Sequence, residues 1–249
     1  MSEPEVSPQV PKLPLVLVLD TSYSMSTQTM EGKRRIDNLI EALSTLKQQI
    51  LNDQQASRSV EVMIYKFGGT VDMLQDFSSI SSLDIEALSS KLTPNGDTPF
   101  FKAIKEAISK ARERREYYKS QGLMSYVPWV WVLTDGEPTD GVDDNGNYTS
   151  SYNDAISLLK DLIANRRINF FMIITGHGND LRNGAEILFN FVSKPTGAPP
   201  PIMMDDVSSN WQKMAIWLSK SISKTSSSKP GQQTQAPPVD FGQPFVINV

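Results

Sequence analysis

The chain of 249 residues has no cysteine and a single histidine, His177. Without thiols it can form no disulfide bond, no thiolate zinc site and no cysteine nucleophile. One imidazole leaves at most one histidine for catalysis, and His177 stands between two glycines with no serine-plus-acid arrangement nearby. We therefore interpret His177 as an ordinary loop residue.

Long apolar runs and an excess of positive charge are missing as well. No stretch approaches the roughly 18 consecutive apolar residues that a membrane span needs. The acidic, proline-rich residues 1–14 contain no apolar core, so we expect no signal peptide and a cytoplasmic protein. With 24 Lys and Arg against 28 Asp and Glu, the net charge is −4, which gives no reason to expect nucleic acid as a partner.

What is present is enough apolar sequence for one folded domain, 39% of all residues. We expect a flexible N-terminal arm at residues 1–12, a single domain at 13–224, and a flexible linker with an apolar tail at 225–249. The tail ends in the apolar segment 241–249, which disorder alone does not explain. Two interpretations stay open: the segment docks onto a partner or onto its own sheet edge, or it is a frayed end.

Apolar strands alternate with amphipathic helices along the domain. Buried strands are predicted at residues 15–19, 60–67, 127–134, 168–174 and 201–204. Helices with apolar residues at spacings of three and four are predicted around residues 36–50, 99–111, 155–163, 181–191 and 211–222. A Gly-Gly turn makes residues 71–77 an antiparallel partner of the second strand. The pattern predicts a Rossmann-like α/β fold: a mostly parallel central sheet with one antiparallel edge strand and helices on both faces.

Polar residues stand at three places where a predicted strand ends or a predicted helix begins. They are Asp20-Thr21-Ser22-Tyr23-Ser24, Gly96-Asp97-Thr98 and Leu133-Thr134-Asp135-Gly136-Glu137. All three should meet at one edge of the sheet, in the crevice where open α/β sheets bind ligands. Carboxylates and hydroxyls without nitrogen or sulfur are ligands of Mg²⁺, or alternatively of Mn²⁺ or Ca²⁺, rather than of zinc.

Together these three stretches resemble the von Willebrand factor A (vWA) domain and its metal-ion-dependent adhesion site (MIDAS). The signature of that site is Asp-x-Ser-x-Ser, followed by a distant Thr and a distant Asp, and all five positions are present in order. The resemblance covers most of the predicted domain. It implies that Ser22, Ser24 and Thr98 contact the metal directly. It also implies that Asp20 and Asp135 act on the metal either directly or through water.

A narrower resemblance rests on residues 133–140, which read Leu-Thr-Asp-Gly-Glu-Pro-Thr-Asp. This segment is similar to the bacterial tellurium-resistance and stress-response proteins of the TerY type. The similarity implies service in a bacterial stress-response or defence operon. It also makes an operon-encoded protein kinase and a PP2C-type phosphatase candidate partners.

The first hypothesis for function is a non-enzymatic, Mg²⁺-dependent protein-binding module that acts as an adaptor or scaffold. A glutamate or aspartate of a partner protein would replace a water on the metal and complete its shell. The residues expected at the rim of this contact are Tyr23, Met25, Asp97, Gly136 and Glu137. Of these, Asp97 adds a third carboxylate, which disfavours an incoming acidic ligand or binds water or a second cation.

The alternative is a Mg²⁺-dependent phosphotransfer enzyme of the haloacid-dehalogenase type, phosphatase-like, with Asp20 as nucleophile. That family needs a second aspartate two residues further on, where this chain has Ser22, and a downstream lysine with no convincing candidate here. A nucleotide hydrolase is a third class, and no Gly-x-x-x-x-Gly-Lys-[Ser/Thr] loop supports it.

The helix after the second polar stretch is predicted to begin with Thr98 as N-cap and Pro99 at the first helical position. Its far end is basic and carries Lys110, Arg112, Arg114, Arg115 and Lys119. A solvated face with cations near the helix C-terminus is favoured over a phosphate-binding patch, and both interpretations stay open at this point.

Overall fold

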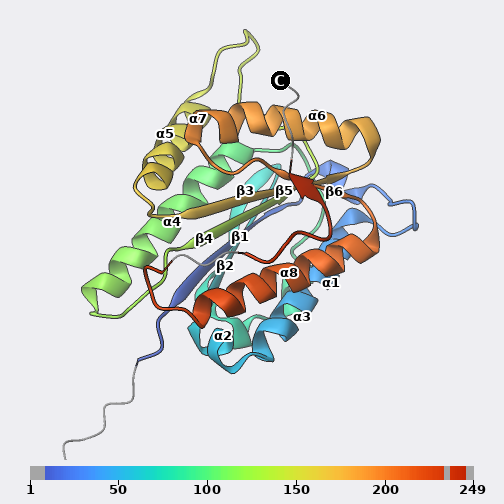
Figure 1. The fold of residues 1–249 in the computed structure, drawn as a ribbon. Helices are drawn as coiled ribbons and strands as arrows, with labels where there is room; N and C mark the ends of the chain where they lie inside the picture. Colours follow the sequence, from blue (N-terminus) through green and yellow to red (C-terminus); the bar gives the residue numbers. More distant parts are fainter. Residues whose placement is uncertain (1–8, 233–235, 245–249) are drawn as a thin grey trace, which may run out of the picture.

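The structure is a computed structural model, which describes residues 9–232 and 236–244. Its described strands form one sheet in the order β3-β2-β1-β4-β5-β6-β7 (Figure 1). Their bounds are β1 Leu13–Asp20, β2 Val60–Gly68, β3 Thr70–Ser79, β4 Trp129–Thr134, β5 Asn169–Gly176, β6 Ile202–Asp205 and β7 Gln243–Pro244. Strands β1, β2, β4, β5 and β6 are parallel, and β3 pairs antiparallel with β2 at one edge. The predicted α/β class with a mostly parallel sheet is confirmed.

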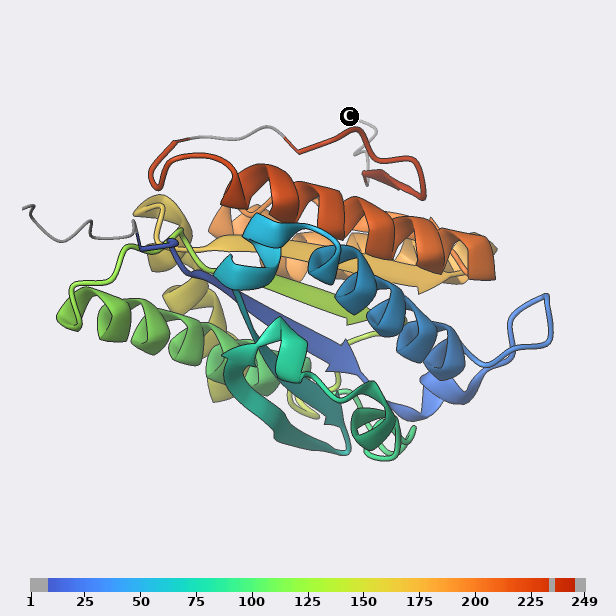
Figure 2. The same cartoon turned by 90° about the horizontal axis from the view of Figure 1, so that it is seen from below.

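Helices cover both faces of the sheet, as Figures 1 and 2 show. One face carries α1 Arg35–Leu51, α2 Gln54–Ser59, α3 Ile85–Ser89 and α8 Ser208–Ser226. The other carries α4 Phe100–Ser120, α5 Ser150–Ala164, α6 Gly178–Leu188 and α7 Lys194–Thr196. Short helical turns are η1 Tyr23–Ser26, η2 Ile80–Ser82 and η3 Phe189–Ser193. Within residues 9–232 and 236–244, no helix combines the length and the apolar character needed to cross a membrane.

The sheet divides the core into two layers, and the inner strand β1 contributes to both. All of its residues are buried. Because side chains alternate along a strand, Leu15, Leu17 and Leu19 join the core under α1 and α8. Val16 and Val18 join the core under α4 and α5. Burial on both faces explains the unbroken apolar run in the sequence.

The turn between β2 and β3 lies against both the segment after β1 and the loop before α4, because its glycines let the backbones touch. A Cβ on Gly68 would lie 2.2 Å from the Thr21 carbonyl oxygen, and one on Gly96 would lie 2.6 Å from the Gly69 Cα. Gly96 also has φ +64°, a conformation that side chains disfavour. Its carbonyl accepts a hydrogen bond from the Tyr23 amide at 3.0 Å. These contacts hold two of the three polar stretches side by side.

The described part of the C-terminal tail lies on its own sheet edge. Strand β7 (Gln243–Pro244) pairs antiparallel with β6. The sheet therefore has a second, short antiparallel strand besides the predicted one, β3. Phe241 is buried and packs edge-on against Trp217, with ring centroids 5.6 Å apart. Of the predicted flexible segments, residues 1–8 of the arm, 233–235 of the linker and 245–249 of the tail lie outside the described residues.

Candidate metal centre

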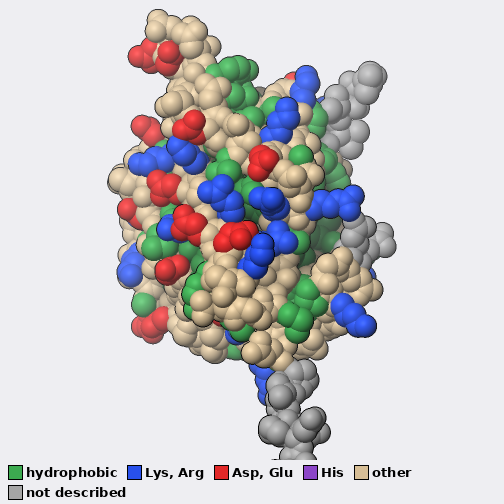
Figure 3. All heavy atoms as spheres, turned by 90° about the vertical axis from the view of Figure 1, so that its left-hand side faces the viewer, with side chains coloured by type: hydrophobic (Ala, Val, Ile, Leu, Met, Phe, Trp, Pro, Cys, Tyr) green, Lys and Arg blue, Asp and Glu red, His purple; other side chains and the backbone are tan. Residues whose placement is uncertain are grey.

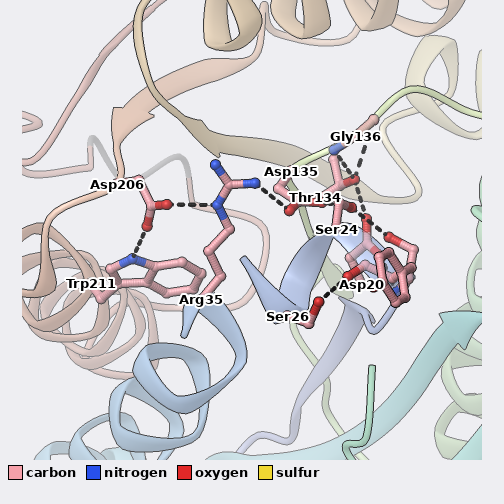
Figure 4. Close-up of polar contacts among 11 residues, drawn as sticks. Asp20, Ser24, Ser26, Arg35, Thr134, Asp135, Gly136, Asp206 and Trp211 are labelled. Carbon is pink, nitrogen blue, oxygen red and sulfur yellow. Dashed lines mark hydrogen bonds and ion pairs between the residues drawn. The ribbon is translucent and has the colours of Figure 1, made fainter. Parts of the chain in front are cut away.

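Asp20 lies at the carboxyl end of β1 and is fully buried. Its Oδ1 accepts a hydrogen bond from the Ser22 amide at 2.7 Å, and its Oδ2 accepts one from the Thr134 hydroxyl at 2.5 Å. Thr134 is the last residue of β4, which pairs directly with β1. The carboxylate is therefore fixed by the two central strands and by the turn that follows β1 (Figure 4).

A chain of hydroxyl contacts connects the turn after β1 to the end of β4. The Ser22 and Ser24 hydroxyl oxygens are 3.0 Å apart. Ser24 donates to the Asp135 Oδ1 at 2.6 Å, across 111 positions of sequence. The first and third polar stretches of the sequence thus meet at one edge of the sheet, as predicted from parallel strand order.

Thr98 completes the group, although it does not cap α4 as expected. The helix begins at Phe100, with Pro99 at the N-cap position. Its first amides are capped instead by Asp140, which accepts from the Phe101 amide at 3.0 Å and the Lys102 amide at 2.9 Å. The expectation of a Thr98 cap was wrong because the capping carboxylate comes from a loop about forty residues away.

The hydroxyl of Thr98 is consequently free to face the other ligands. It makes no hydrogen bond within the part of the chain that the structure describes. A Cβ built on Gly136 would lie 3.8 Å from the Thr98 hydroxyl and 3.6 Å from that of Ser24. The two hydroxyls therefore flank the same glycine. We call Asp20, Ser22, Ser24, Thr98 and Asp135 the metal centre.

The donor set of the metal centre fits a hard cation. It consists of two carboxylates and three hydroxyls, all oxygen, which suits Mg²⁺, Mn²⁺ or Ca²⁺. Within the described ranges, no group of three or more His, Cys, Asp or Glu side chains is placed to hold a metal ion. A cation bound here must therefore take hydroxyl ligands as well as carboxylates.

Burial and mutual repulsion set the charge of the two carboxylates. Burial raises the pKa of Asp20 to about 7, and the negative charge of Asp135 adds to the rise, against hydrogen bonds from Ser22 and Thr134. Burial also raises the pKa of Asp135, while the Ser24 hydroxyl and the charge of Arg35 oppose that rise. A divalent cation between the two carboxylates would remove the repulsion that favours protonation.

Arg35 is a charged neighbour of the metal centre that the sequence analysis missed. At the start of α1, its Nη1 lies 2.7 Å from the Asp135 Oδ2 and its Nε lies 2.6 Å from the Asp206 Oδ2 (Figure 4). The other oxygen of Asp206 accepts from the Trp211 indole at 3.3 Å. Arg35 thereby orients Asp135 and ties α1 to the ends of β4 and β6. The signal for Asp206 was its place just after the last parallel strand, at the same sheet edge.

The predicted rim residues differ in accessibility. Tyr23 is 75% exposed, and Asp97 and Glu137 are exposed at the surface. Gly136 is half-buried between the hydroxyls of the metal centre. Met25 is 0% exposed and packs in the core under α1, because the 3₁₀ turn η1 points it inward. The expectation that Met25 contacts a partner is therefore corrected.

The open sheet, with its polar group at the carboxyl ends of the central strands, defines a Rossmann-like α/β domain with a candidate cation site. Residues 15–195 match the family model of the von Willebrand factor type A domain, so the chain belongs to this family. Domains of this family are commonly used for protein–protein adhesion, and they often bind a divalent metal. No curated protein matches the chain in sequence.

Solved structures with a similar fold include bacterial pilus proteins. The PilB minor pilin of Streptococcus sanguinis has a TM-score of 0.59 at 14% identity, over 87% of this chain and 63% of the pilin. The vWF domain of the type V pili tip protein Mfa5 of Porphyromonas gingivalis has a TM-score of 0.58 at 13% identity, over 92% and 99% of the two chains. This chain thus matches less than two thirds of the pilin's length. At these identities the similarity concerns the fold.

Proposed function

We propose that this chain is a non-enzymatic protein-binding module whose metal centre holds Mg²⁺ and, through it, an acidic side chain of a partner. One observation carries the proposal: carboxylates and hydroxyls from two remote stretches converge beside the hydroxyl of Thr98, in a third stretch, which has no hydrogen-bond partner within the described residues. Two interacting carboxylates that are both buried are costly in their charged form unless a cation balances them.

The chemistry of Mg²⁺ explains how such a site would recognise a partner. The ion takes about six oxygens in near-octahedral geometry and readily keeps water ligands. Asp20 and Asp135 would balance its charge, and the hydroxyls of Ser22, Ser24 and Thr98 would add ligands without adding charge. A carboxylate from a partner could replace a water, and the exposed Tyr23 would contact the partner surface around it.

Phosphotransfer with Asp20 as nucleophile is the weaker candidate. Asp20 is fully buried, and each of its oxygens accepts a hydrogen bond. A nucleophile must present an oxygen to the substrate within close reach. The buried carboxylate therefore favours a role in binding a cation over a role in attacking phosphorus.

The biological setting remains part of the proposal. Two settings follow from different similarities: a bacterial stress-response or defence system with a kinase and a PP2C-type phosphatase, or adhesion at a surface as in the pilus proteins of similar fold. We propose the first, a TerY-type role in the cytoplasm, because it rests on the specific sequence 133–140. The pilus proteins share only the fold at 13–14% identity.

Substitutions at Thr98 test the metal centre, because its hydroxyl makes no hydrogen bond within the described residues. Thr98→Val should abolish Mg²⁺ binding in calorimetry and Mg²⁺-dependent capture of partner proteins, and Thr98→Ser should retain both. The exposed Thr93→Val, in the same loop, is the matched control and should leave both unchanged. Equal Mg²⁺ binding by the valine and serine variants at Thr98 would contradict the proposal.

A further inference from the structure

A hollow of about 510 Å³ lies at the opposite end of the sheet from the metal centre. Arg112, Arg115 and Lys119 of α4 reach it, and Arg167, which follows α5, reaches it from the side. We call these four residues the basic hollow. Figure 3 shows Lys and Arg side chains gathered near the centre of the side on which α4 and α5 lie. Parallel strands begin here, about 25 Å from their carboxyl ends.

The cations of the basic hollow have no carboxylate partner among the described residues. None of the four makes an ion pair within residues 9–232 and 236–244. Three other cations of the same helix do, and they are Lys105 with Asp154, Lys110 with Glu113, and Arg114 with Glu61. Glu116 also lines the hollow, so one carboxylate stands there against the four cations. The hollow therefore carries an excess of positive charge, although the net charge of the chain is −4.

Stabilisation of the helix end does not explain this arrangement. Cations interact favourably with the helix dipole only within about the last turn. Lys119 lies in that turn, whereas Arg112 lies two turns earlier and Arg167 belongs to another segment. The spacing of Arg112, Arg115 and Lys119 instead places them on one face of α4, at intervals of three and four residues.

Arg167 is held beside this face by a backbone contact. The Arg115 Nη1 donates to the Arg167 carbonyl oxygen at 3.4 Å. The apolar side chain of Leu123 and the amide side chain of Asn165 also line the hollow. The result is a row of positive charges about 10 Å long, because seven residues of helix separate Arg112 from Lys119, with a further guanidinium alongside.

We propose that the basic hollow binds a ligand that carries two or more phosphate groups. Guanidinium groups bind phosphate oxygens through paired hydrogen bonds, a geometry that lysine does not match. Three of the four cations are arginines, and their row is longer than one phosphate group. The volume lies within the range of small-molecule sites. The ligand is either a small polyphosphate or a phosphorylated segment of a partner protein, and the two sources share this chemistry.

The test is calorimetric titration with inorganic triphosphate in buffer without divalent ions, so that the metal centre takes no part. The wild type should bind. The double variant Arg115→Gln/Arg167→Gln should bind about tenfold more weakly or worse, since it loses two charge-assisted contacts. The variant Lys105→Gln/Lys110→Gln removes the same charge from the same helix outside the hollow and should match the wild type within about twofold.

A second variant protects the test against loss of folding. Arg112→Gln/Lys119→Gln removes two exposed cations and should weaken binding to a similar degree, with an unchanged melting temperature. No binding of triphosphate by the wild type would overturn the proposal. Equal weakening in the Lys105→Gln/Lys110→Gln control would also overturn it, because the effect would then come from net charge alone.

A further arm of the titration separates the two sources of phosphate. A peptide with two neighbouring phosphoserines is compared with triphosphate and with the unphosphorylated peptide. Tighter binding of the phosphopeptide assigns the hollow to a partner segment, and tighter binding of triphosphate assigns it to a small polyphosphate. Binding of the unphosphorylated peptide as tight as that of the phosphopeptide would contradict phosphate recognition.

Discussion

Beside the metal centre the Arg35 guanidinium is largely buried and paired with two carboxylates, whereas the cations of the basic hollow lie near the surface and have no carboxylate partners among the described residues. Arg35 illustrates the first state, since it lies between two carboxylates. Arg115 illustrates the second, since its described contact is a backbone carbonyl. Both ends of the sheet therefore use arginine, but for different purposes. Where arginine is enclosed by carboxylates it holds structure, and where it is left unpaired it is available to a ligand.

The largest expected effect comes from removing the guanidinium of Arg35, which lies between two carboxylates. Arg35→Met leaves Asp135 and Asp206 buried without their cation, so the free energy of unfolding should fall by about 3–5 kcal/mol. Urea unfolding of the metal-free protein measures this loss. The control is Arg34→Gln at the neighbouring position. It breaks an exposed ion pair between Arg34 and Asp37 and should lower the free energy of unfolding by less than about 1 kcal/mol. Equal losses in the two variants would show that the Arg35 contacts carry no special weight.

The next effect concerns pH and the buried Asp20. Its pKa is raised to about 7 in the folded protein, so the folded state holds a proton that the unfolded state releases near pH 4. The contribution of protonated Asp20 to the free energy of unfolding is fully present below about pH 4 and is lost as the pH rises toward 7. Above about pH 7 it does not change further. The stability of the wild type minus that of Asp20→Asn, measured in chelator, should therefore decrease across this window.

The slope of that difference should approach about 1 kcal/mol per pH unit in the middle of the window. Asp20→Asn keeps the shape of the side chain and removes the charge, so the metal-free variant should be more stable than the wild type at pH 8. A difference that stays constant from pH 4 to pH 7 would mean that Asp20 is ionised in the folded protein throughout.

The smallest expected effect lies at the other end of the sheet. Arg112→Gln and Lys119→Gln remove exposed cations that make no ion pair with any described residue, so each should change the free energy of unfolding by less than about 0.5 kcal/mol. Thermal unfolding at low salt measures this change. A clear loss of stability would place these residues with Arg35 as structural cations and would remove the contrast between the two ends.

Much of the fold could be predicted from local pattern. The unbroken apolar run at β1, the alternation of strands with helices and the glycine turn before β3 each reflect a local rule of burial or backbone geometry. The meeting of the three polar stretches followed from strand order, because parallel strands end at one edge. In these cases the information lies within a few residues of each element.

What could not be predicted depends on contacts between remote segments. Asp140 caps α4 from another loop, so the local preference of Thr98 for the N-cap position was overruled. Arg34 and Arg35 are indistinguishable in sequence, yet only the second turns toward the metal centre. Met25 looks like a rim residue until the turn η1 points it into the core. Side-chain direction after a strand end is set by packing, which single residues do not encode.

Diffraction from crystals soaked in Mn²⁺ tests the metal centre most directly, because the ion is located by its anomalous scattering. We predict a peak within about 2.5 Å of the Ser22 and Ser24 hydroxyl oxygens, with Thr98 on the same ion, at the carboxyl end of β1. A second crystal of Thr98→Val should lose that peak. Ordered crystals soaked with Mn²⁺ that show no peak among these oxygens, or show one only elsewhere, would contradict the account.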